Sequence, residues 1–122
     1  MSDRAMQEPT LLLLAALAAE PKHGYALIQE VDTISAGRVR LRVGTLYSAL
    51  DRLQREGLIR VEREEVVDGR ARKVYALADQ GHDALAAETR RLRALLAAVE
   101  QSARPRERAS KAVSPRPRGA LA

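Results

Sequence analysis

The stretch from Gly44 to Ile59 constrains the fold more than any other part of the chain, because it predicts an amphipathic helix followed by a turn. Apolar residues recur there at the i, i+3, i+4 and i+7 spacing of one helical stripe: Leu46, Ala49, Leu50 and Leu53. We expect that stripe to face a core. The other side carries short hydrogen-bonding groups, a tyrosine and two arginines: Thr45, Tyr47, Ser48, Asp51, Arg52 and Arg55. A solvated helix more commonly presents Glu and Lys, so this side indicates a contact surface.

Length and composition exclude several classes of function. The chain has 122 residues and no Cys, which predicts one small domain with an appendage and excludes thiolate metal sites and disulfides. With two histidines in all, we expect no metal and no cofactor. The apolar run Leu11–Ala19 is too short to span a bilayer, so we expect no membrane partner and a cytoplasmic protein. Because no paired carboxylates, activated nucleophile or glycine-rich phosphate loop occurs, we do not expect an enzyme.

Positive charge is concentrated in two places. The formal net charge is +5, and residues 102–122 alone account for it with six basic residues and one acidic residue. Residues 1–101 are neutral overall, yet residues 38–73 hold 10 basic and 6 acidic side chains. A DNA-binding domain needs a local basic face rather than a basic total. This segregation therefore indicates a polyanionic partner.

Two helices are predicted before the amphipathic one. We expect residues 1–8 to be a flexible N-terminus and Pro9–Ala19 to be a helix with proline near its start. The successive leucines from Leu11 to Leu14 imply that this helix is buried on more than one side. Residues 21–24 predict a break, and Tyr25–Ile34 predicts the second helix.

A two-stranded β-wing is predicted after Gly57. Residues 58–67 are rich in β-branched side chains, and residues 72–77 return as a second strand. Between them, Asp68-Gly69 is a hairpin-turn dipeptide. The tip and the return strand carry the basic residues Arg70, Arg72 and Lys73 beside Tyr75.

The C-terminal part predicts a long helix and then a tail. From Asp79 to Gln101, apolar residues recur near a heptad spacing: Leu85, Leu92, Leu95, Leu96 and Val99. A helix of this length has nothing left in its own domain to pack on, so it is predicted to be a dimerisation helix. Residues 102–122 contain three prolines among arginines, serines and alanines, with no apolar period, which predicts a disordered basic tail.

Taken in order, these elements resemble the PadR family of transcriptional regulators. The matching residues are His23 to Leu27, Gly44 to Tyr47, Leu50, Arg52, Leu53, Gly57 to Ile59, Gly69 to Tyr75, Leu77 and Gly81. The resemblance covers roughly residues 9–101 and is to the short-chain branch with one dimerisation helix. It implies a mainly α fold with a two-stranded β-wing: a winged helix-turn-helix domain over residues 9–78, then the dimerisation helix over 79–101.

The resemblance also implies a function. It implies a homodimeric, sequence-specific repressor that binds double-stranded DNA at an inverted repeat and acts on its own or a neighbouring operon. A small-molecule effector stays open, although the dimerisation helix lacks the aromatic side chains that would stack on a flat ligand. The candidate DNA contacts are Arg42, Thr45, Tyr47, Ser48, Arg52, Arg70, Arg72, Lys73 and Tyr75. The candidate dimer contacts are Leu12, Leu85, Leu92, Leu95, Leu96 and Val99.

Some of these assignments have a structural alternative. Tyr25 is expected to be a half-buried packing residue rather than a contact, and His23 a loop residue rather than a proton switch. Tyr75 could equally cover the hairpin or touch DNA. For the whole chain, the alternative is a winged-helix protein–protein interaction module that does not bind DNA. That alternative predicts an apolar exposed face on the recognition helix, which does not fit the residues expected there: Thr45, Tyr47, Ser48, Arg52 and Arg55.

Overall fold

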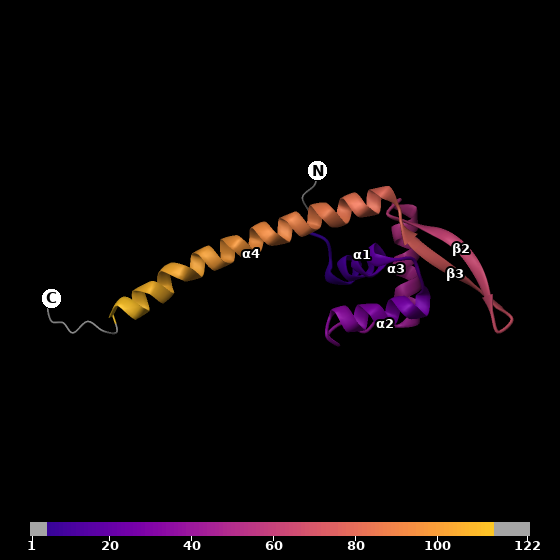
Figure 1. Ribbon diagram of the computed structural model, residues 1–122, viewed down its shortest axis with the longest axis horizontal. Coiled ribbons are helices and arrows are strands. Elements are labelled where there is room, and N and C mark those ends of the chain that lie inside the picture. The colour runs from indigo at the N-terminus through magenta and orange to yellow at the C-terminus, as the bar shows by residue number, and fades with distance from the viewer. Residues whose placement is uncertain (1–4, 114–122) are drawn as a thin grey trace. The chain divides into compact units, whose positions relative to one another are not determined.

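The computed structural model describes residues 5–113, with side chains for residues 5–103. Within this range the elements follow in the order α1 (Glu8–Ala19), β1 (Lys22–His23), α2 (Gly24–Ile34), α3 (Val43–Arg55), β2 (Ile59–Val67), β3 (Arg70–Leu77) and α4 (Asp79–Val113) (Figure 1). The chain divides after Glu88 into two compact units. The predicted fold class is confirmed, since three helices, a β-hairpin and a long C-terminal helix appear in the expected order.

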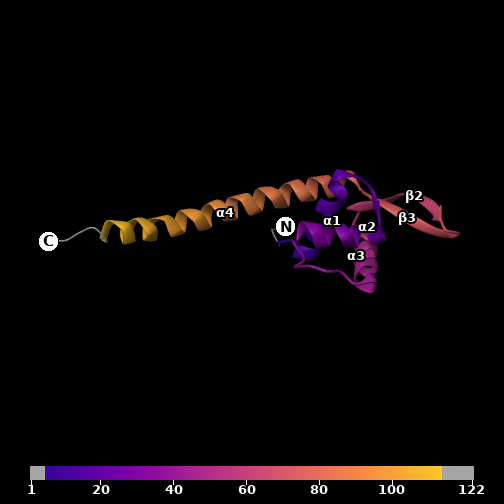
Figure 2. The ribbon, with the colours of Figure 1, turned by 60° about the horizontal axis from the view of Figure 1, so that its bottom comes forward.

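Leucines of α1, α2 and α3 build the core of the first unit. These helices gather at the base of the β2–β3 hairpin (Figure 2). In α1, Leu13 and Leu14 are completely buried although they are adjacent in sequence, so this helix is covered on more than one side, as predicted. Leu12 is only 8% exposed and belongs to the same core. The structure therefore corrects the assignment of Leu12 as a dimer contact, because its own domain already covers it.

The apolar stripe of α3 is buried as expected. Leu46, Leu50 and Leu53 have no exposed surface, and Ala49 packs at the edge of the same cluster. Burying three leucine side chains stabilises the fold by roughly 1.5–3 kcal/mol each before entropy is counted. The helix begins at Val43, so Thr45 lies in its first turn while the tyrosine and serine that follow lie in the second. The stripe thus fixes which side of α3 is left for contacts.

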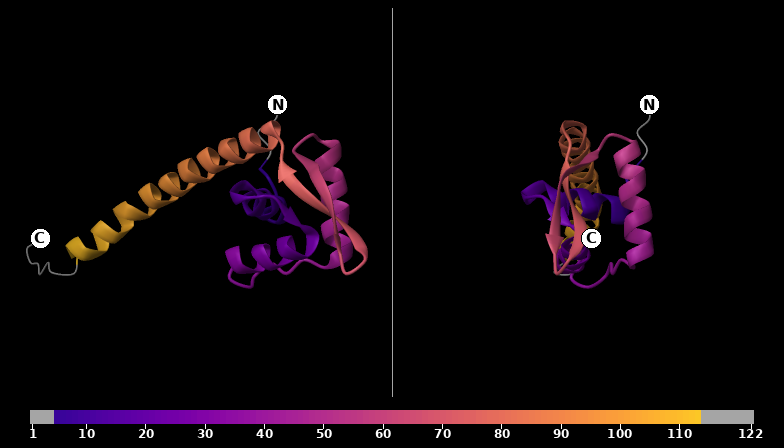
Figure 3. Two further views of the ribbon diagram at one scale, coloured as in Figure 1. Left: turned by 45° about the vertical axis from the view of Figure 1, so that its right-hand side comes forward. Right: turned by 90° about the vertical axis from the view of Figure 1, so that its right-hand side faces the viewer.

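The wing belongs to a three-stranded antiparallel sheet with the order β1-β3-β2. The predicted turn is confirmed: Asp68 and Gly69 both have positive φ, 52° and 77°, which is the backbone of a two-residue type I′ hairpin. The third strand was not predicted. It pairs Lys22 with Tyr75 and His23 with Val74, and two residues are too few to show the alternation that identifies a strand. The recognition-type helix α3 lies beside the hairpin (Figure 3).

The long helix α4 extends beyond its predicted end. It continues past Gln101 to Val113, in a segment whose Ala, Arg, Glu and Lys residues are good helix formers despite Pro105. The remainder of the predicted disordered tail, 114–122, and residues 1–4 of the predicted flexible N-terminus lie outside the described residues. No helix in the described part of the chain is long and apolar enough to cross a membrane.

Candidate nucleic-acid interface

The solvent side of α3 is mainly polar after its first residue, Val43, which is 61% exposed. Thr45, Ser48 and Arg55 are exposed, and Tyr47 exposes 44% of its surface. Arg42 is the N-cap residue of the helix, but its side chain makes no capping hydrogen bond and projects into solvent. Such a surface offers hydroxyl and guanidinium donors that suit phosphates and base edges.

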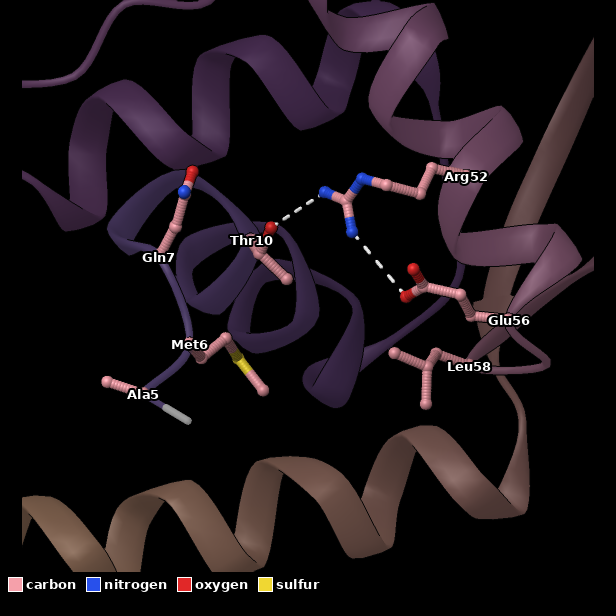
Figure 4. A pocket seen from close by; sticks show the side chains of 7 residues that line it. All are labelled: Ala5, Met6, Gln7, Thr10, Arg52, Glu56 and Leu58. Atoms are coloured by element: carbon pink, nitrogen blue, oxygen red, sulfur yellow. Dashed lines mark hydrogen bonds and ion pairs between the residues drawn. The ribbon is translucent and has the colours of Figure 1, made fainter. Parts of the chain in front are cut away.

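Arg52 does not belong to that surface. Its Nη2 donates to Thr10 Oγ1 at 2.8 Å, and its Nη1 lies 3.5 Å from Glu56 Oε1 (Figure 4). The guanidinium thus links α3 to α1, so the structure corrects the assignment of Arg52 as a DNA contact. Because Arg52 directly precedes the buried Leu53, its side chain starts at the edge of the apolar stripe.

A hollow of about 470 Å³ opens beside this linkage. Its lining comes from the segment before α1, from α1, from the end of α3 and from the loop after it: Ala5, Met6, Gln7, Thr10, Arg52, Glu56 and Leu58 (Figure 4). The Arg52 guanidinium that faces it is already held by a hydroxyl and a carboxylate. Within the described residues, no group of His, Asp and Glu side chains could hold a metal ion.

Tyr75 is a core residue. Only 4% of its surface is exposed, and the whole run from Val74 to Leu77 is buried, because β3 enters the core halfway along its length. Burial raises the pKa of the Tyr75 phenol, and the neighbouring Tyr47 and Asp51 raise it further. The structure therefore corrects the assignment of Tyr75 as a DNA contact and favours its packing alternative.

At the start of α2 one of two expectations fails. Tyr25 is 66% exposed, so the expectation of a half-buried packing residue was wrong. His23 is the N-cap of α2, and its Nδ1 accepts a hydrogen bond from the Ala26 backbone N–H at 3.3 Å. Burial and the Arg72 guanidinium lower the pKa of His23, with Glu65 opposing them. The neutral imidazole that this bond requires is thereby favoured, which supports the structural role.

Arginines on the wing are partly paired with glutamates. Arg72 Nε donates to Glu65 Oε1 at 3.1 Å, and Arg63 Nη2 donates to Glu65 Oε2 at the same distance. Hydrogen bonds from Arg63 and then Arg72 lower the pKa of Glu65. Arg72 keeps its two terminal nitrogens for another acceptor, because only its Nε is used in this pair.

Among the described side chains of the first unit, four exposed cations have no acidic partner. Among its described side chains, the arginines of the loop before α3 and of β2 are otherwise paired with carboxylates, as Arg38 is with Glu8 at 2.7 Å. The exposed cations without an ion pair there are Arg42, Arg55, Arg70 and Lys73. They come from the two ends of α3 and from the wing, the elements predicted to approach DNA.

The predicted dimer residues on α4 fall into two groups. Leu85 is partly buried and packs on the core of the first unit, so the structure corrects its assignment to an intersubunit seam. Leu95, Leu96 and Val99 expose 51%, 58% and 57% of their surfaces, and Leu92 is intermediate. Three large apolar side chains thus share one exposed side of this helix.

Comparisons with known proteins agree with this architecture. The model of the transcriptional regulator PadR-like family matches residues 13–87. The chain is 41% identical over 85 residues to the transcriptional regulator Rv3488 of Mycobacterium tuberculosis, covering 70% of this chain and 76% of that protein. A PadR family transcription regulator from Clostridium difficile has a similar structure, with a TM-score of 0.66 and 24% identity over 78% of this chain and 97% of that one. Bacillus subtilis PadR, solved in complex with operator DNA, has a TM-score of 0.58 and 21% identity over 65% and 45% of the two chains.

Proposed function

The chain belongs to the PadR-like family of transcriptional regulators, which are not enzymes, and we propose that it is a homodimeric repressor that binds double-stranded DNA through α3 and the wing. The observation that carries this proposal is the exposed polar side of α3, flanked by cations with no acidic partner. The structure of Bacillus subtilis PadR in complex with operator DNA supports DNA as the partner.

In the proposed complex, α3 enters the major groove and reads bases. Thr45, Tyr47 and Ser48 are the exposed side chains of its first two turns, and the N-terminal residues of a recognition helix are those that reach base edges. A phenol can donate to a phosphate oxygen or lay its ring on a thymine methyl. Arg55 is at the far end of the helix, where it would meet backbone phosphate.

The wing and the start of α3 supply the sequence-independent attraction. Arg42, Arg70 and Lys73 are exposed and unpaired within the described part of the chain, so each can neutralise a phosphate and release a counterion. Arg72 contributes through the terminal nitrogens that Glu65 leaves free. Two wings and two recognition helices would match an inverted-repeat operator.

The second copy of the chain is proposed to cover the apolar side of α4. Leu92, Leu95, Leu96 and Val99 have the near-heptad spacing of a helix–helix seam. Two half-sites bound together give far higher affinity than one, so dimerisation is part of the proposed repression.

A mobility-shift assay with the DNA upstream of the protein's own gene tests the proposal. Lys73→Ala and Arg70→Ala should each weaken binding and lower the salt slope by about one. Arg38→Ala is the matched control, because it removes the same charge from a guanidinium that Glu8 already neutralises. Absence of binding to any promoter fragment or random duplex would contradict the proposal and favour the protein-interaction module.

A further inference from the structure

Gly24 occupies a position where the backbone does not call for glycine. It is the first residue of α2, and it is not among the described glycines with positive φ, which are Gly37, Gly57 and Gly69. An alanine could adopt the same backbone conformation and would favour the helix. The reason for a glycine at this position must therefore lie in the space around it.

That space is filled by the side chain of Tyr47. A Cβ built on Gly24 would overlap the Tyr47 hydroxyl oxygen and would lie 2.9 Å from Tyr47 Cζ and 3.3 Å from Leu46 Cδ2. The phenol of Tyr47 thus lies across the start of α2, in contact with a residue that is itself buried. Since 44% of Tyr47 stays exposed, the ring is held on one side and open on the other.

Two further polar side chains belong to elements close in sequence or in the sheet to this pair. The charges of Tyr47 and Asp51 both raise the pKa of the buried Tyr75 phenol, after burial itself. Asp51 is one turn along α3 from Tyr47, and Tyr75 is on β3, paired with the residue two before Gly24. The contact that fixes the Tyr47 ring is therefore the one with Gly24 at the start of α2.

We propose that Gly24 is a positioning residue for Tyr47, because the missing Cβ lets the phenol lie against α2 in the one orientation from which α3 presents it to DNA. The proposal rests on the proposed function for its effect on DNA, but the packing of Gly24 against Tyr47 does not depend on it. A methyl group at position 24 should push the ring aside without unfolding the domain, because the two nearest obstructing atoms are the far end of a partly exposed side chain and the buried Leu46 Cδ2, at 3.3 Å, needs to give way by only a few tenths of an ångström.

A DNA-independent experiment tests the packing. The chain has three tyrosines, so full-length protein labelled with 3-fluorotyrosine should give three fluorine resonances, and Tyr47→Phe assigns one of them. Gly24→Ala should shift the Tyr47 resonance of the free protein. Gly44→Ala is the matched control, because a Cβ there meets no atom within 4 Å. A Tyr47 resonance that stays in place in Gly24→Ala would overturn the proposal.

A double-mutant cycle tests the consequence for DNA. Affinities for the promoter duplex and for random duplex are measured for the parent protein, Gly24→Ala, Tyr47→Ala and the double variant. Gly24→Ala should lower the ratio of the two affinities by about tenfold, the order of one good base contact. In the Tyr47→Ala background it should lower that ratio no further.

The outcomes separate the packing of Gly24 against Tyr47 from the role of Tyr47 in reading DNA. Equal losses from Gly24→Ala in both backgrounds would show that Gly24 does not act through Tyr47 and would overturn the proposal. If the fluorine resonance moves but neither Gly24→Ala nor Tyr47→Ala changes the affinity ratio, the packing of the pair stands. The role of Tyr47 in reading DNA would then be wrong.

Discussion

Two helical stretches rich in leucine and alanine, one in α1 and one in α4, differ in how far they are buried. The leucine- and alanine-rich α1 buries Leu13 and Leu14 completely, whereas α4, over residues 92–99, exposes about half of Leu95 and Leu96. Both stretches are apolar enough to form a core. The difference comes from what is available to cover them: α1 is enclosed by α2 and the sheet of its own unit, while no described residue of the chain covers the exposed side chains of α4. Burial in one chain is therefore decided by neighbours rather than by composition.

The largest expected effect comes from opening the core at α1. Leu13→Ala removes a completely buried side chain, so it should lower the free energy of unfolding by about 3 kcal/mol. Denaturant unfolding should show the same loss at every protein concentration. Leu95→Ala makes the same chemical change on α4, and its cost should depend on concentration if a second subunit covers that residue. If both variants lose the same free energy of unfolding at every protein concentration, the second subunit does not cover Leu95.

A charge on the exposed side of α4 should act on association rather than on folding. Leu96→Glu would place an unpaired carboxylate in the proposed seam, so the dimer dissociation constant should rise on the order of 100-fold. Sedimentation would report the change, and the unfolding of the first unit should be unaffected. Ala94→Glu, which introduces the same charge on the opposite side of the helix, is the control. A Leu96→Glu protein that still sediments as the parent does would place the seam elsewhere.

A smaller effect is expected where α1 is fastened to α3. Thr10→Val keeps the shape of a side chain that is 9% exposed but removes the acceptor of the 2.8 Å bond from Arg52. The free energy of unfolding should fall by about 1 kcal/mol. Glu56→Gln weakens only the exposed 3.5 Å pair and should change stability by at most a few tenths of a kcal/mol. The reverse order in thermal or urea unfolding would show that the carboxylate, not the hydroxyl, holds the guanidinium.

The smallest effect on stability is expected from Glu65, which lies neither in the core nor in the proposed apolar seam of α4. The folded-state pKa of Glu65 is lowered from its ordinary value of 4.5 by hydrogen bonds from Arg63 and Arg72. The stability that this pairing contributes is present above the ordinary value and is lost as the pH falls through the lowered one. Urea unfolding of Glu65→Gln should therefore differ from the parent at pH 7 and converge with it at strongly acidic pH. Glu64→Gln, at a position with no ion pair in the described part of the chain, should show no such convergence.

Regular patterns in the sequence predicted the fold well. The leucine stripe of α3, the Asp68-Gly69 turn and the order of the helices depend on local geometry, which the sequence shows directly. The pairing of β1 with β3 joins residues more than fifty positions apart through only two residue pairs. No local pattern could show it. The helix α4 continues past its predicted end at Gln101, because the residues that follow include many good helix formers besides Pro105.

The contact residues were harder to predict than the elements that carry them. Tyr25 was expected to be half-buried and is exposed, and Tyr75, whose role was left open, is buried. For Arg52 and Tyr75 the outcome depends on a neighbour from another element. Arg52 faces Thr10 of α1, and Tyr75 lies where β3 passes into the core. Residue type and helical position identified the solvent-exposed side of α3 but could not show that the Arg52 side chain bonds to another helix.

The short strand β1 has a mechanical consequence. His23 pairs with Val74 of the wing strand, and α2 begins at the very next residue, so no slack separates the sheet from the helix. If the hairpin bends toward a ligand, the start of α2 should rotate with it, because the two are joined at His23. In the proposed complex, contacts of the wing with the DNA backbone and contacts of the helices with the DNA groove would then form together rather than in separate steps. Amide hydrogen exchange would display this as a single opening event shared by Lys22, His23 and the facing residues of β3.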